Sequence, residues 1–467
     1  MEPYKLDASL DANKVFVVKR SELEGRFDTE FYKNDYKELY LKLKSLNHYK
    51  LKDIAKFSSE SWNQKDYFQN EFPYIEISEI NLSDGSINNI NLLPISEAPS
   101  RAKMIVRKND IIISTTRPTR GAISFLSNIN DIKIASTGFA VIREVSNDVS
   151  KEFLFLILRQ DFILKQFGQR SSGGNYPAIT QEELGKVIIP KIEKSIQKQI
   201  VDIYNNAYTQ KQAKEAEAKA LLASIDTYLL NELGITLPEK DNSLEARIFT
   251  TKFSEVVGGR FDPDYHQIFY RNFVDVLVCI NSKKLSELTS DIFQGVGKDE
   301  VEFSEYKLLK VKNIQKGNII DYSDVEYVRK VPINKILQKG DIISPFIGEA
   351  IRQIKFSNFN NLESKFTVDN NTGVIRLFKT TNNEFVCECL NSSIGKIQIN
   401  RLIGGGGVPF LGSNNVKEIL IPHPPLQKQN EIAEHIAGIR THAKALQQEA
   451  EQVLATAKQQ VEQMILG

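Results

Sequence analysis

Two similar octapeptides that both begin with GRFD lie in this 467-residue chain, and this repeat limits the possible folds more than any other feature. GRFDTEFY begins at Gly25, and GRFDPDYH begins at Gly259, about half the chain further on. Later segments correspond in the same order: RKNDIIIS and QKGDIIS, STGFAVIR and NTGVIRL, RSSGGNYPAIT and RLIGGGGVPFL, VIIPKIEKSIQKQI and ILIPHPPLQKQNEI. A repeat of roughly 233 residues is far longer than a solenoid repeat. The sequence therefore predicts two copies of one folded module.

Each copy shows the same order of predicted elements: a short amphipathic helix, a β-rich stretch and one long helix. The strands are predicted from branched and aromatic runs between turn signals, such as DIIIS and FAVIREV. We expect an α+β fold in which the two copies are related by a pseudo-two-fold duplication. The predicted β-rich domains cover 1–190 and 236–422, and the long helices cover 191–235 and 423–467.

Apolar residues in both long helices recur at alternating steps of three and four, which is typical of a coiled-coil seam. The predicted seam includes Val201, Tyr204, Tyr208, Leu222, Ile225, Leu229, Ile432, Ile436, Ile439, Leu446 and Val453. Two equivalent stripes in a duplicated chain are expected to bury each other, although each could instead pack against its own domain. Lys211 and Glu215 interrupt the first seam, where they could face the partner helix or mark a docking site for another subunit.

Chain continuity favours an antiparallel pair, because a parallel pair would require the chain to return along the first helix. At 1.5 Å per residue the seams would be about 40 Å long. One turn of B-DNA is roughly 34 to 36 Å long. These lengths lead to the hypothesis that the helices act as a spacer between two domains that read DNA.

The net charge is only +1, from 60 Lys and Arg against 59 Asp and Glu, so there is no global basic surface. Locally, residues 101–180 hold twelve basic against six acidic side chains, and residues 311–410 carry about +4. Such stretches could be solvated faces or phosphate-binding surfaces. The glycine-containing loops RPTRG and RSSGGNYP favour nucleic acid, because glycine permits close approach and Asn, Ser and Tyr can bond base edges. The predicted DNA-contacting residues are Trp62, Lys65, Arg101, Lys103, Arg107, Arg117, Thr119, Arg120, Arg170, Asn175, Tyr176, Gln294, Lys298, Lys312, Arg352, Lys355 and Arg401.

Several residue types have a structural alternative. Trp62, the only tryptophan, lies in a polar loop, where it could contact DNA or anchor the loop. Cys387 and Cys389 lie in the run EFVCECL, which we interpret as a strand. Three cysteines are too few for a disulfide framework, so we expect reduced structural thiols, with a metal or redox role as the alternative. No histidine belongs to a recognisable ligand set, and no apolar run is long enough for a signal peptide or a membrane span. We therefore expect a cytoplasmic protein without a metal.

The twofold ordered series of GRFD, DIIS-type strands, STGF or NTGV segments, and I-P followed by Q-K-Q resembles the specificity subunit of type I restriction-modification systems. The resemblance covers nearly the whole chain. It implies that each β-rich domain is a target recognition domain for half of a split duplex DNA site. It also implies that the helices space these domains and dock two methylation subunits, with restriction subunits joining the complex.

The resemblance further implies a non-catalytic chain, whose partners use S-adenosylmethionine, ATP and magnesium. The sequence agrees, because it contains neither an Asn/Asp-Pro-Pro-Tyr/Phe motif nor a G-x-x-x-x-G-K-[ST] loop. Two alternatives remain: a specificity chain of another adenine-methylation or phage-defence system, and a coiled-coil scaffold that binds proteins but not DNA. Neighbouring genes would distinguish the first, and sequence-specific retardation of duplex DNA would distinguish the second.

Overall fold

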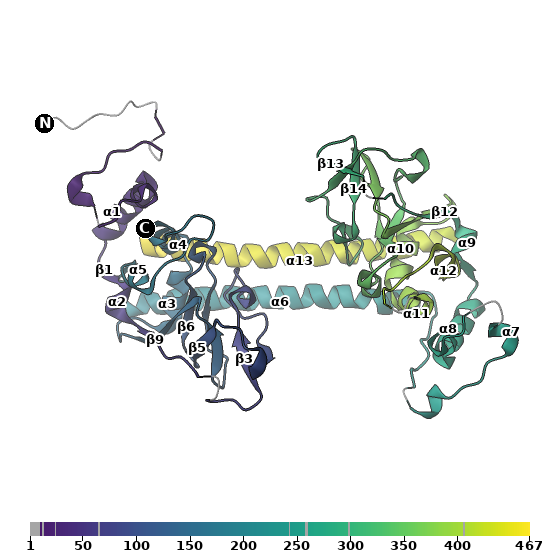
Figure 1. Ribbon diagram of the computed structural model, residues 1–467, viewed down its shortest axis with the longest axis horizontal. Helices are drawn as coiled ribbons and strands as arrows, with labels where there is room; N and C mark the ends of the chain where they lie inside the picture. Colours follow the sequence, from purple (N-terminus) through teal and green to yellow (C-terminus); the bar gives the residue numbers. More distant parts are fainter. Residues whose placement is uncertain are drawn as a thin grey trace. The chain divides into compact units, whose positions relative to one another are not determined.

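The structure is a computed structural model that describes residues 10–11, 14–23, 25–63, 66–241, 243–256, 260–297, 299–404 and 407–467. The chain divides into two compact units. Unit 1 comprises Met1–Glu215 with Gln448–Gly467, and unit 2 comprises Ala216–Gln447. Each long helix therefore contributes to both units. Figure 1 shows the elements with their labels.

In its described residues, unit 1 contains two four-stranded sheets and a short two-stranded sheet. The first sheet is antiparallel and has the order β2-β9-β6-β7. The second has the order β4-β3-β8-β5, with β3 and β8 parallel. The bounds are β1 His48–Lys50, β2 Ala55–Ser58, β3 Glu71–Ile75, β4 Asn91–Pro94, β5 Ala102–Val106, β6 Ile111–Ser114, β7 Ile123–Phe125, β8 Lys133–Ser136, β9 Phe139–Val145 and β10 Ile188–Pro190. The predicted strands in DIIIS and FAVIREV are thus confirmed as β6 and β9.

Strand β6 is buried along its whole length, and its first three residues are isoleucines on alternating faces. Ile111 and Ile113 belong to one core with the helices of unit 1, whereas Ile112 belongs to a second core with Ile75 and Ala135 of the other sheet. Side chains alternate between the faces of a strand, so a strand covered on both faces has no polar face.

The helices of unit 1 begin at side-chain caps where the sequence supplies them. They are α1 Asn34–Ser45, α2 Leu51–Ile54, α3 Lys151–Leu158, α4 Asp161–Arg170 and α5 Gln181–Gly185. The Ser150 hydroxyl accepts a hydrogen bond from the Phe153 amide at the start of α3, and Thr180 does the same for Glu183 at α5. These helices fill the first core, in which Phe153 and Phe167 are fully buried.

Unit 2 repeats this plan in its described residues. An antiparallel sheet has the order β12-β21-β18-β19, a mixed sheet has the order β13-β17-β14-β20, and β11-β22 and β15-β16 are two-stranded. The strands are β11 Ser282–Lys284, β12 Thr289–Gln294, β13 Glu300–Val301, β14 Tyr306–Leu309, β15 Ile314–Gln315, β16 Ile319–Ile320, β17 Glu326–Val328, β18 Ile342–Pro345, β19 Ser357–Asn358, β20 Lys365–Val368, β21 Thr372–Leu377 and β22 Leu420–Pro422. The helices are α7 Phe253–Val256, α8 Ile268–Cys279, α9 Leu285–Leu288, α10 Asn383–Asn391, α11 Ser393–Leu402 and α12 Ser413–Lys417.

The repeated GRFD motif fastens the start of unit 1 to the end of α4. The Arg26 guanidinium donates to both carboxylate oxygens of Asp28 and to the backbone carbonyls of Arg170 and Ser171, at 3.1 and 3.2 Å. The Tyr32 hydroxyl donates to the Arg26 carbonyl at 2.9 Å. A cation that bonds the last carbonyls of a helix satisfies acceptors that the helix itself leaves open.

The second copy of the motif makes the same contacts in unit 2. Arg260 pairs with Asp262 and donates to the carbonyls of Leu402 and Ile403 at the end of α11, at 2.9 and 3.1 Å. A ring nitrogen of His266 bonds the Arg260 carbonyl at 2.7 Å, where unit 1 uses Tyr32. The octapeptide therefore recurs because the same fastening is made once in each unit.

A buried glutamine is also repeated. The Gln166 side chain donates to the Ile188 carbonyl at 3.0 Å and accepts from the Ile188 amide at 2.8 Å. Gln398 makes the same pair of bonds with Leu420, at 2.9 and 2.8 Å. Each glutamine thus ties the helix before the glycine-containing loop to the strand before the long helix.

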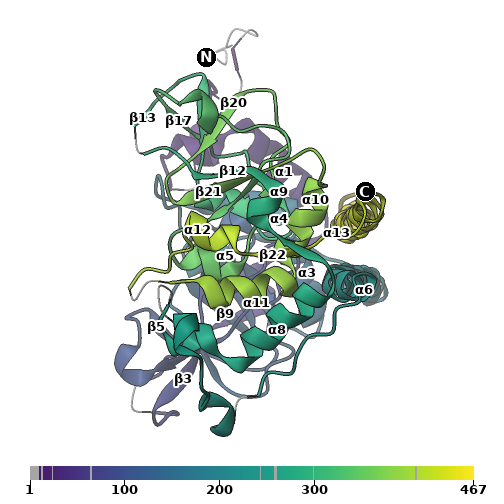
Figure 2. The same cartoon turned by 90° about the vertical axis from the view of Figure 1, so that its right-hand side faces the viewer.

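The long helices are α6 Lys194–Glu232 and α13 Leu426–Leu466. Both begin four residues after the proline that ends the preceding strand, Pro190 and Pro422, although the two junctions differ in sequence. Figure 2 shows the two helices nearly end-on and side by side.

The helices run antiparallel within each unit, as predicted. In unit 1, Lys214 in the middle of α6 forms an ion pair of 2.6 Å with Glu449 of α13. In unit 2, Tyr228 near the end of α6 stacks on His435 near the start of α13, with ring centroids 4.1 Å apart. Ala218, which precedes Tyr228 on α6, packs with Ala443, which follows His435 on α13, so within unit 2 the order along α6 is the reverse of the order along α13.

The apolar stripes of α6 and α13 pack partly against each other and partly against the domain cores. In unit 2, Ala218 packs with Ala443 and Leu446, which is a helix-to-helix contact. Elsewhere the stripes also enter the domain cores, where Tyr204 and Leu454 share one cluster with the helices and strands of unit 1. Among the predicted seam positions, Leu222 remains 37% exposed. Both sequence-based alternatives for the stripes therefore hold in part.

Lys211, the polar residue in the first seam, bonds the β-rich domain of its own unit. Its ammonium group lies 2.6 Å from the Asp84 carboxylate and 3.2 Å from Glu215. Burial would raise the pKa of Asp84, but hydrogen bonds from Lys211 and Ser86 outweigh it and hold that pKa below its usual value. The seam is thus interrupted where the domain inserts a carboxylate against the helix.

The expected strand around Cys387 and Cys389 is wrong, because these residues lie on α10. The Asn382 side chain accepts a hydrogen bond from the Phe385 amide and starts the helix. Short apolar runs such as EFVCECL fit a buried helix as well as a strand. Both thiols are free and buried, and burial raises the pKa of each well above its usual value.

Candidate nucleic-acid interface

In unit 1 the structure brings together the two loops that the sequence singles out. The RPTRG loop at 117–121 follows the buried strand β6, and the RSSGGNYP loop at 170–177 follows α4. The Arg117 amide donates to the Pro177 carbonyl at 2.7 Å, and the Ile179 amide donates to the Thr115 carbonyl at 2.9 Å. Thr116 and Ala178 form an antiparallel bridge. We call these two segments the loop pair of unit 1.

Arg117 and Tyr176 form a stacked unit on this loop pair. The Arg117 guanidinium lies 4.4 Å from the Tyr176 ring centroid and donates to the Asn175 carbonyl at 3.2 Å. The Tyr176 side chain is 71% exposed. A planar guanidinium with one face on an aromatic ring keeps its edge available for bidentate hydrogen bonds.

The backbone at Arg117 is in the left-handed region, with φ of 47° and ψ of 52°. This conformation costs a non-glycine residue about 1 to 2 kcal/mol. Strained backbone of this kind is concentrated at functional sites. The conformation therefore supports a role for the Arg117 side chain that glycine could not fill.

Unit 2 contains the equivalent loop pair with different side chains. The Gly348 amide donates to the Pro409 carbonyl at 2.8 Å, and the Leu411 amide donates to the Phe346 carbonyl at 2.8 Å. These bonds repeat those of unit 1, so Gly348 occupies the position of Arg117, and its φ of 93° is also positive. Phe410 is 43% exposed on the second of these loops. We call the segment 346–348 and the segment 409–411, which these bonds join, the loop pair of unit 2.

The predicted DNA-contacting residues of unit 1 differ in exposure. Arg101, Lys103, Thr119, Arg120 and Asn175 are exposed. Arg107 is half-buried and donates to Glu60 at 2.5 Å, and Glu60 also pairs with Arg143. The exposed group can reach a ligand directly, whereas Arg107 would first have to leave a carboxylate.

Arg170 and Trp62 are buried and have structural partners. Arg170 is 5% exposed and lies 3.0 Å from Glu183. Burial would raise the pKa of Glu183, but hydrogen bonds from Lys186 and Arg170 hold it below its usual value. The Trp62 ring nitrogen donates to the Ala102 carbonyl at 2.6 Å, and the ring packs in a core with Phe72. Of the two alternatives for Trp62, its burial supports the structural anchor.

The predicted residues of unit 2 are mostly engaged within the domain. Lys312 pairs with Asp324 and Glu326, and Arg401 stacks on Tyr265 and donates to its carbonyl at 3.0 Å.

The other three predicted residues differ in exposure. Lys355 donates to the Ile314 carbonyl, and burial together with Lys316 lowers the pKa of Lys355. Gln294 is half-buried, whereas Arg352 is exposed beside Glu349. Lys65 and Lys298 lie outside the described residues.

Sequence reasoning missed the residues that hold the loop pairs in place. Arg26 and Arg260 fix the helix ends from which the glycine-containing loops depart, and Gln166 and Gln398 fix the same helices from the other side. The signal was available in the sequence, because each of these residues has its counterpart in the other repeat. Within the described residues, no group of His, Cys, Asp and Glu could hold a metal ion, and no helix could span a membrane.

Known proteins share this sequence pattern. Residues 44–222 match the family model described as type I restriction modification DNA specificity domain. The type I restriction enzyme HindI specificity subunit of Haemophilus influenzae is 31% identical over 143 residues, which cover 30% of this chain and 28% of that subunit. The MjaVIII specificity subunit of Methanocaldococcus jannaschii is 22% identical over 387 residues, which cover 78% of this chain and 80% of that one.

A solved structure on complex assembly and conformational transition of the type I R-M system contains a chain that is 19% identical. The alignment covers 90% of this chain and 96% of that one, with a TM-score of 0.47. The resemblance inferred from the repeated motifs is confirmed by the family model and the sequence relatives. The chain is thus similar to type I restriction-modification specificity subunits, with the family model matched over residues 44–222.

Proposed function

We propose that this chain selects the DNA target of a type I restriction-modification complex and reads a duplex site in two parts, with one β-rich domain for each half-site. The loop pairs carry the proposal. Each unit places a loop after its central buried strand beside a glycine-containing loop, with repeated backbone bonds and different side chains. Variable side chains on a fixed scaffold are the usual basis of specific recognition.

The loop pair of unit 1 has the chemistry for DNA. Arg117 and Arg120 can contact phosphates or guanine edges, and Asn175 can bond adenine. The exposed ring of Tyr176 can stack on a base or pack against a sugar. The loop pair of unit 2 offers mainly backbone groups and the exposed ring of Phe410, which suits shape and apolar contacts such as the thymine methyl group.

The chemistry of modification and cleavage belongs, in this proposal, to partner chains. Two methylation subunits supply adenine methylation with S-adenosylmethionine, and restriction subunits use ATP and magnesium. The helices α6 and α13 act as the spacer, and this chain itself supplies no catalytic group. The partners are proposed from the similarity of the chain to type I specificity subunits.

The test is methylome sequencing of a host that carries this gene with its methylation partner. We expect one split motif with two fixed half-sites separated by a constant spacer. The purified complex should then retard duplex DNA of that motif and not a duplex in which either half-site is scrambled. Methylation with no motif, or binding that is equal for every duplex, would contradict the proposal. Retention of partner binding without any DNA binding would favour the protein-scaffold alternative.

A further inference from the structure

One loop of unit 1, which lies between strands β3 and β4, is bonded by both long helices. The Lys211 ammonium group of α6 lies 2.6 Å from the Asp84 carboxylate of this loop. The Tyr204 hydroxyl, earlier on α6, donates to the Asp84 carbonyl at 3.2 Å. Lys458 of α13 donates to the Ser83 carbonyl at 2.9 Å. We call these three side chains, with their acceptors on Ser83 and Asp84, the clamp of unit 1.

The loop in the clamp is itself fixed to the body of the domain. Gly85 has a positive φ of 79°, and a Cβ atom there would lie 2.6 Å from the Ile123 carbonyl oxygen. Arg159 donates to the Leu82 carbonyl at 3.0 Å and to the Ile123 carbonyl at 3.1 Å. The Gly85 amide donates to the Asn81 carbonyl at 2.8 Å. A bond from a long helix to this loop therefore acts on the whole domain.

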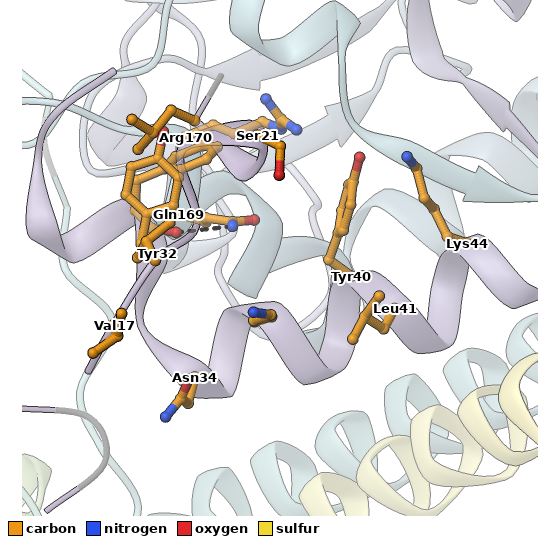
Figure 3. Close-up of a pocket in the computed structure, with 13 residues that line it drawn as sticks. Val17, Ser21, Tyr32, Asn34, Tyr40, Leu41, Lys44, Gln169 and Arg170 are labelled. Atoms are coloured by element: carbon orange, nitrogen blue, oxygen red, sulfur yellow. Dashed lines mark hydrogen bonds between the residues drawn. The ribbon is translucent and has the colours of Figure 1, made fainter. Parts of the chain in front are cut away.

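The fastening at the GRFD motif of unit 1 does not involve the long helices. Figure 3 shows Gln169 and Arg170 of α4, Tyr32, and Tyr40 and Leu41 of α1 around one cavity. None of the described residues that line this cavity belongs to α6 or α13. This fastening joins parts of the domain to one another and does not set the position of the domain on the long helices.

The equivalent position on α13 carries no charge. Gln197 of α6 and Gln429 of α13 each accept a hydrogen bond from the amide of a cap residue, at α3 and α10 respectively, which aligns the two long helices. By this alignment Ala443 occupies the position of Lys211. Ala443 packs in an apolar cluster with Leu446. The helix side of the clamp is thus absent from this repeat.

The loop side of the clamp is also changed in unit 2. NLSDGS of unit 1 corresponds to NIQKGN, so Lys316 replaces Asp84. Among the described residues of unit 2, no side chain of α6 or α13 forms a hydrogen bond with this loop. A cavity of about 530 Å³ lies here instead, and its lining includes Lys316, Ile225 of α6 and Arg440 of α13. The two units therefore differ at the place where the long helices meet this loop.

The clamp is a poor source of stability. Asp84, Arg159 and Lys211 are each at most 6% exposed. Burial lowers the pKa of Lys458, and the nearby Arg159 lowers it further. One carboxylate thus lies among three partly or fully buried cations. Buried ion pairs add little stability compared with apolar residues, and their best attested use is to fix one arrangement of two packed elements.

Directional bonds supply what the apolar contacts do not. The core of unit 1 packs the domain against both long helices, at Tyr204 and Leu454 for example. Apolar burial is non-directional and tolerates small shifts of one surface over another. A buried carboxylate, in contrast, loses its partner when the loop moves away from the ammonium group. The polar contacts of the clamp therefore select one position among those that the apolar core permits.

We propose that the clamp holds the β-rich domain of unit 1 at one position on the long helices, and that Asp84, Lys211 and Lys458 are positioning residues that fix the spacer between the half-sites. This inference rests on the proposed function, because a spacer exists only if the chain reads two half-sites. One base pair more or less in the spacer moves a half-site by about 3.4 Å and turns it by roughly 35°. A domain held by the clamp does not follow such a change.

The experiment is methylome sequencing of a host that carries the full chain with its methylation partner, with methylated sites sorted by spacer length. Asp84→Asn combined with Lys211→Met removes both buried charges at similar side-chain volume, a change that is often neutral for stability. Lys458→Met removes the bond from α13 and leaves only a carbonyl without its donor. Lys214→Met combined with Glu449→Gln is the matched control, because this ion pair of 2.6 Å also joins α6 to α13 but does not involve the loop.

The wild type and the control should methylate sites with one spacer length. In both clamp variants, methylation at spacers one base pair shorter or longer should rise about tenfold over the wild-type background, which is the scale of one hydrogen bond to a charged group. Their melting temperatures should stay close to that of the wild type. If the double variant does not fold, Lys458→Met decides the question.

An unchanged spacer distribution in the folded clamp variants would overturn the proposal. Equal broadening in the control would also overturn it, because any loosening between the long helices would then be sufficient. A wild type without a split motif would instead contradict the proposed function. That result differs from a split motif whose spacer does not respond to the clamp.

Discussion

Arg117 offers a way to separate folding from DNA recognition with one substitution. Its backbone is left-handed, and the equivalent position in unit 2 is Gly348. Arg117→Gly should relieve roughly 1 kcal/mol of backbone strain. The greater freedom of glycine in the unfolded chain costs about 0.5 to 1 kcal/mol. The two effects nearly cancel, so the melting temperature should change by no more than a few degrees.

The same substitution should weaken binding of the target. A bidentate contact between arginine and a base contributes about 1 to 3 kcal/mol, which corresponds to roughly 5- to 150-fold in affinity. Tyr176→Ala removes only the ring under the guanidinium, a contact of about 0.5 to 1 kcal/mol at an exposed site. Tyr176→Phe keeps the ring and should bind almost as well as the wild type. The expected order of loss is therefore Arg117→Gly, then Tyr176→Ala, then Tyr176→Phe.

The assay is competition binding of the assembled complex to its methylome-derived duplex. Guanine is the expected partner of Arg117, since its O6 and N7 accept a bidentate pair of bonds. Replacing each guanine of one half-site in turn by 7-deazaguanine removes N7. At one position this change should weaken wild-type binding and leave Arg117→Gly unaffected. Lys56→Ala, which removes an 80% exposed cation from the same unit, serves as the control for charge alone.

Unchanged affinity of Arg117→Gly, with an unchanged salt dependence, would remove Arg117 from the interface. A loss that is equal for all sequences, with a salt slope reduced by about one, would make Arg117 a phosphate contact. Loss of preference at both half-sites together would contradict the assignment of one half-site to each unit.

Three other predictions concern the stability of unit 1 and the length of the long helices. Trp62→Ala should lower the free energy of unfolding by about 3 to 5 kcal/mol, seen by denaturant titration, because Trp62 is buried; normal stability with lost DNA binding would contradict the anchor role. Asp84→Ala leaves Lys211 without its main buried partner and should cost about 3 to 5 kcal/mol, less if Lys211→Met is added. The pKa of Asp84 is depressed in the folded state, so its ionised carboxylate adds to the free energy of unfolding above the unfolded pKa of about 3.9. This stability is lost as the pH falls through the folded pKa. Thermal melts below about pH 4 can show the loss. Inserting four residues near Ala216 adds roughly 6 Å of helix, so the spacer hypothesis predicts a motif lengthened by one or two base pairs, and an unchanged spacer would refute it.

The repeat made the fold accessible to sequence reasoning, because each element could be checked against its counterpart. The antiparallel helices were predicted from chain continuity, and the strands in DIIIS and FAVIREV from branched and aromatic runs between turn residues. The helix at Cys387 was missed because a short buried run carries no period that distinguishes helix from strand.

The candidate site was predicted less well, since charge in a sequence does not say which cations already have partners. Arg170 and Arg107 lie in the same basic stretch as Arg120, yet carboxylates outside that stretch engage the first two. Glu183 and Glu60 reach them only after folding. Pairing of this kind is set by tertiary structure and cannot be read from local composition.

The two loop pairs also predict the symmetry of the target. Equivalent backbone bonds hold Arg117 in unit 1 and Gly348 in unit 2. At this equivalent position, unit 1 therefore presents a guanidinium group and unit 2 presents only backbone. Identical half-sites would need identical contacts, and these contacts differ in charge, reach and hydrogen-bonding capacity. The methylated motif should therefore consist of two different half-sites and should not be an inverted repeat. The Gly348→Arg variant tests whether this position reads a base. Methylome sequencing of the variant should show an altered base preference in one half-site only. A palindromic motif for the wild type would refute the argument.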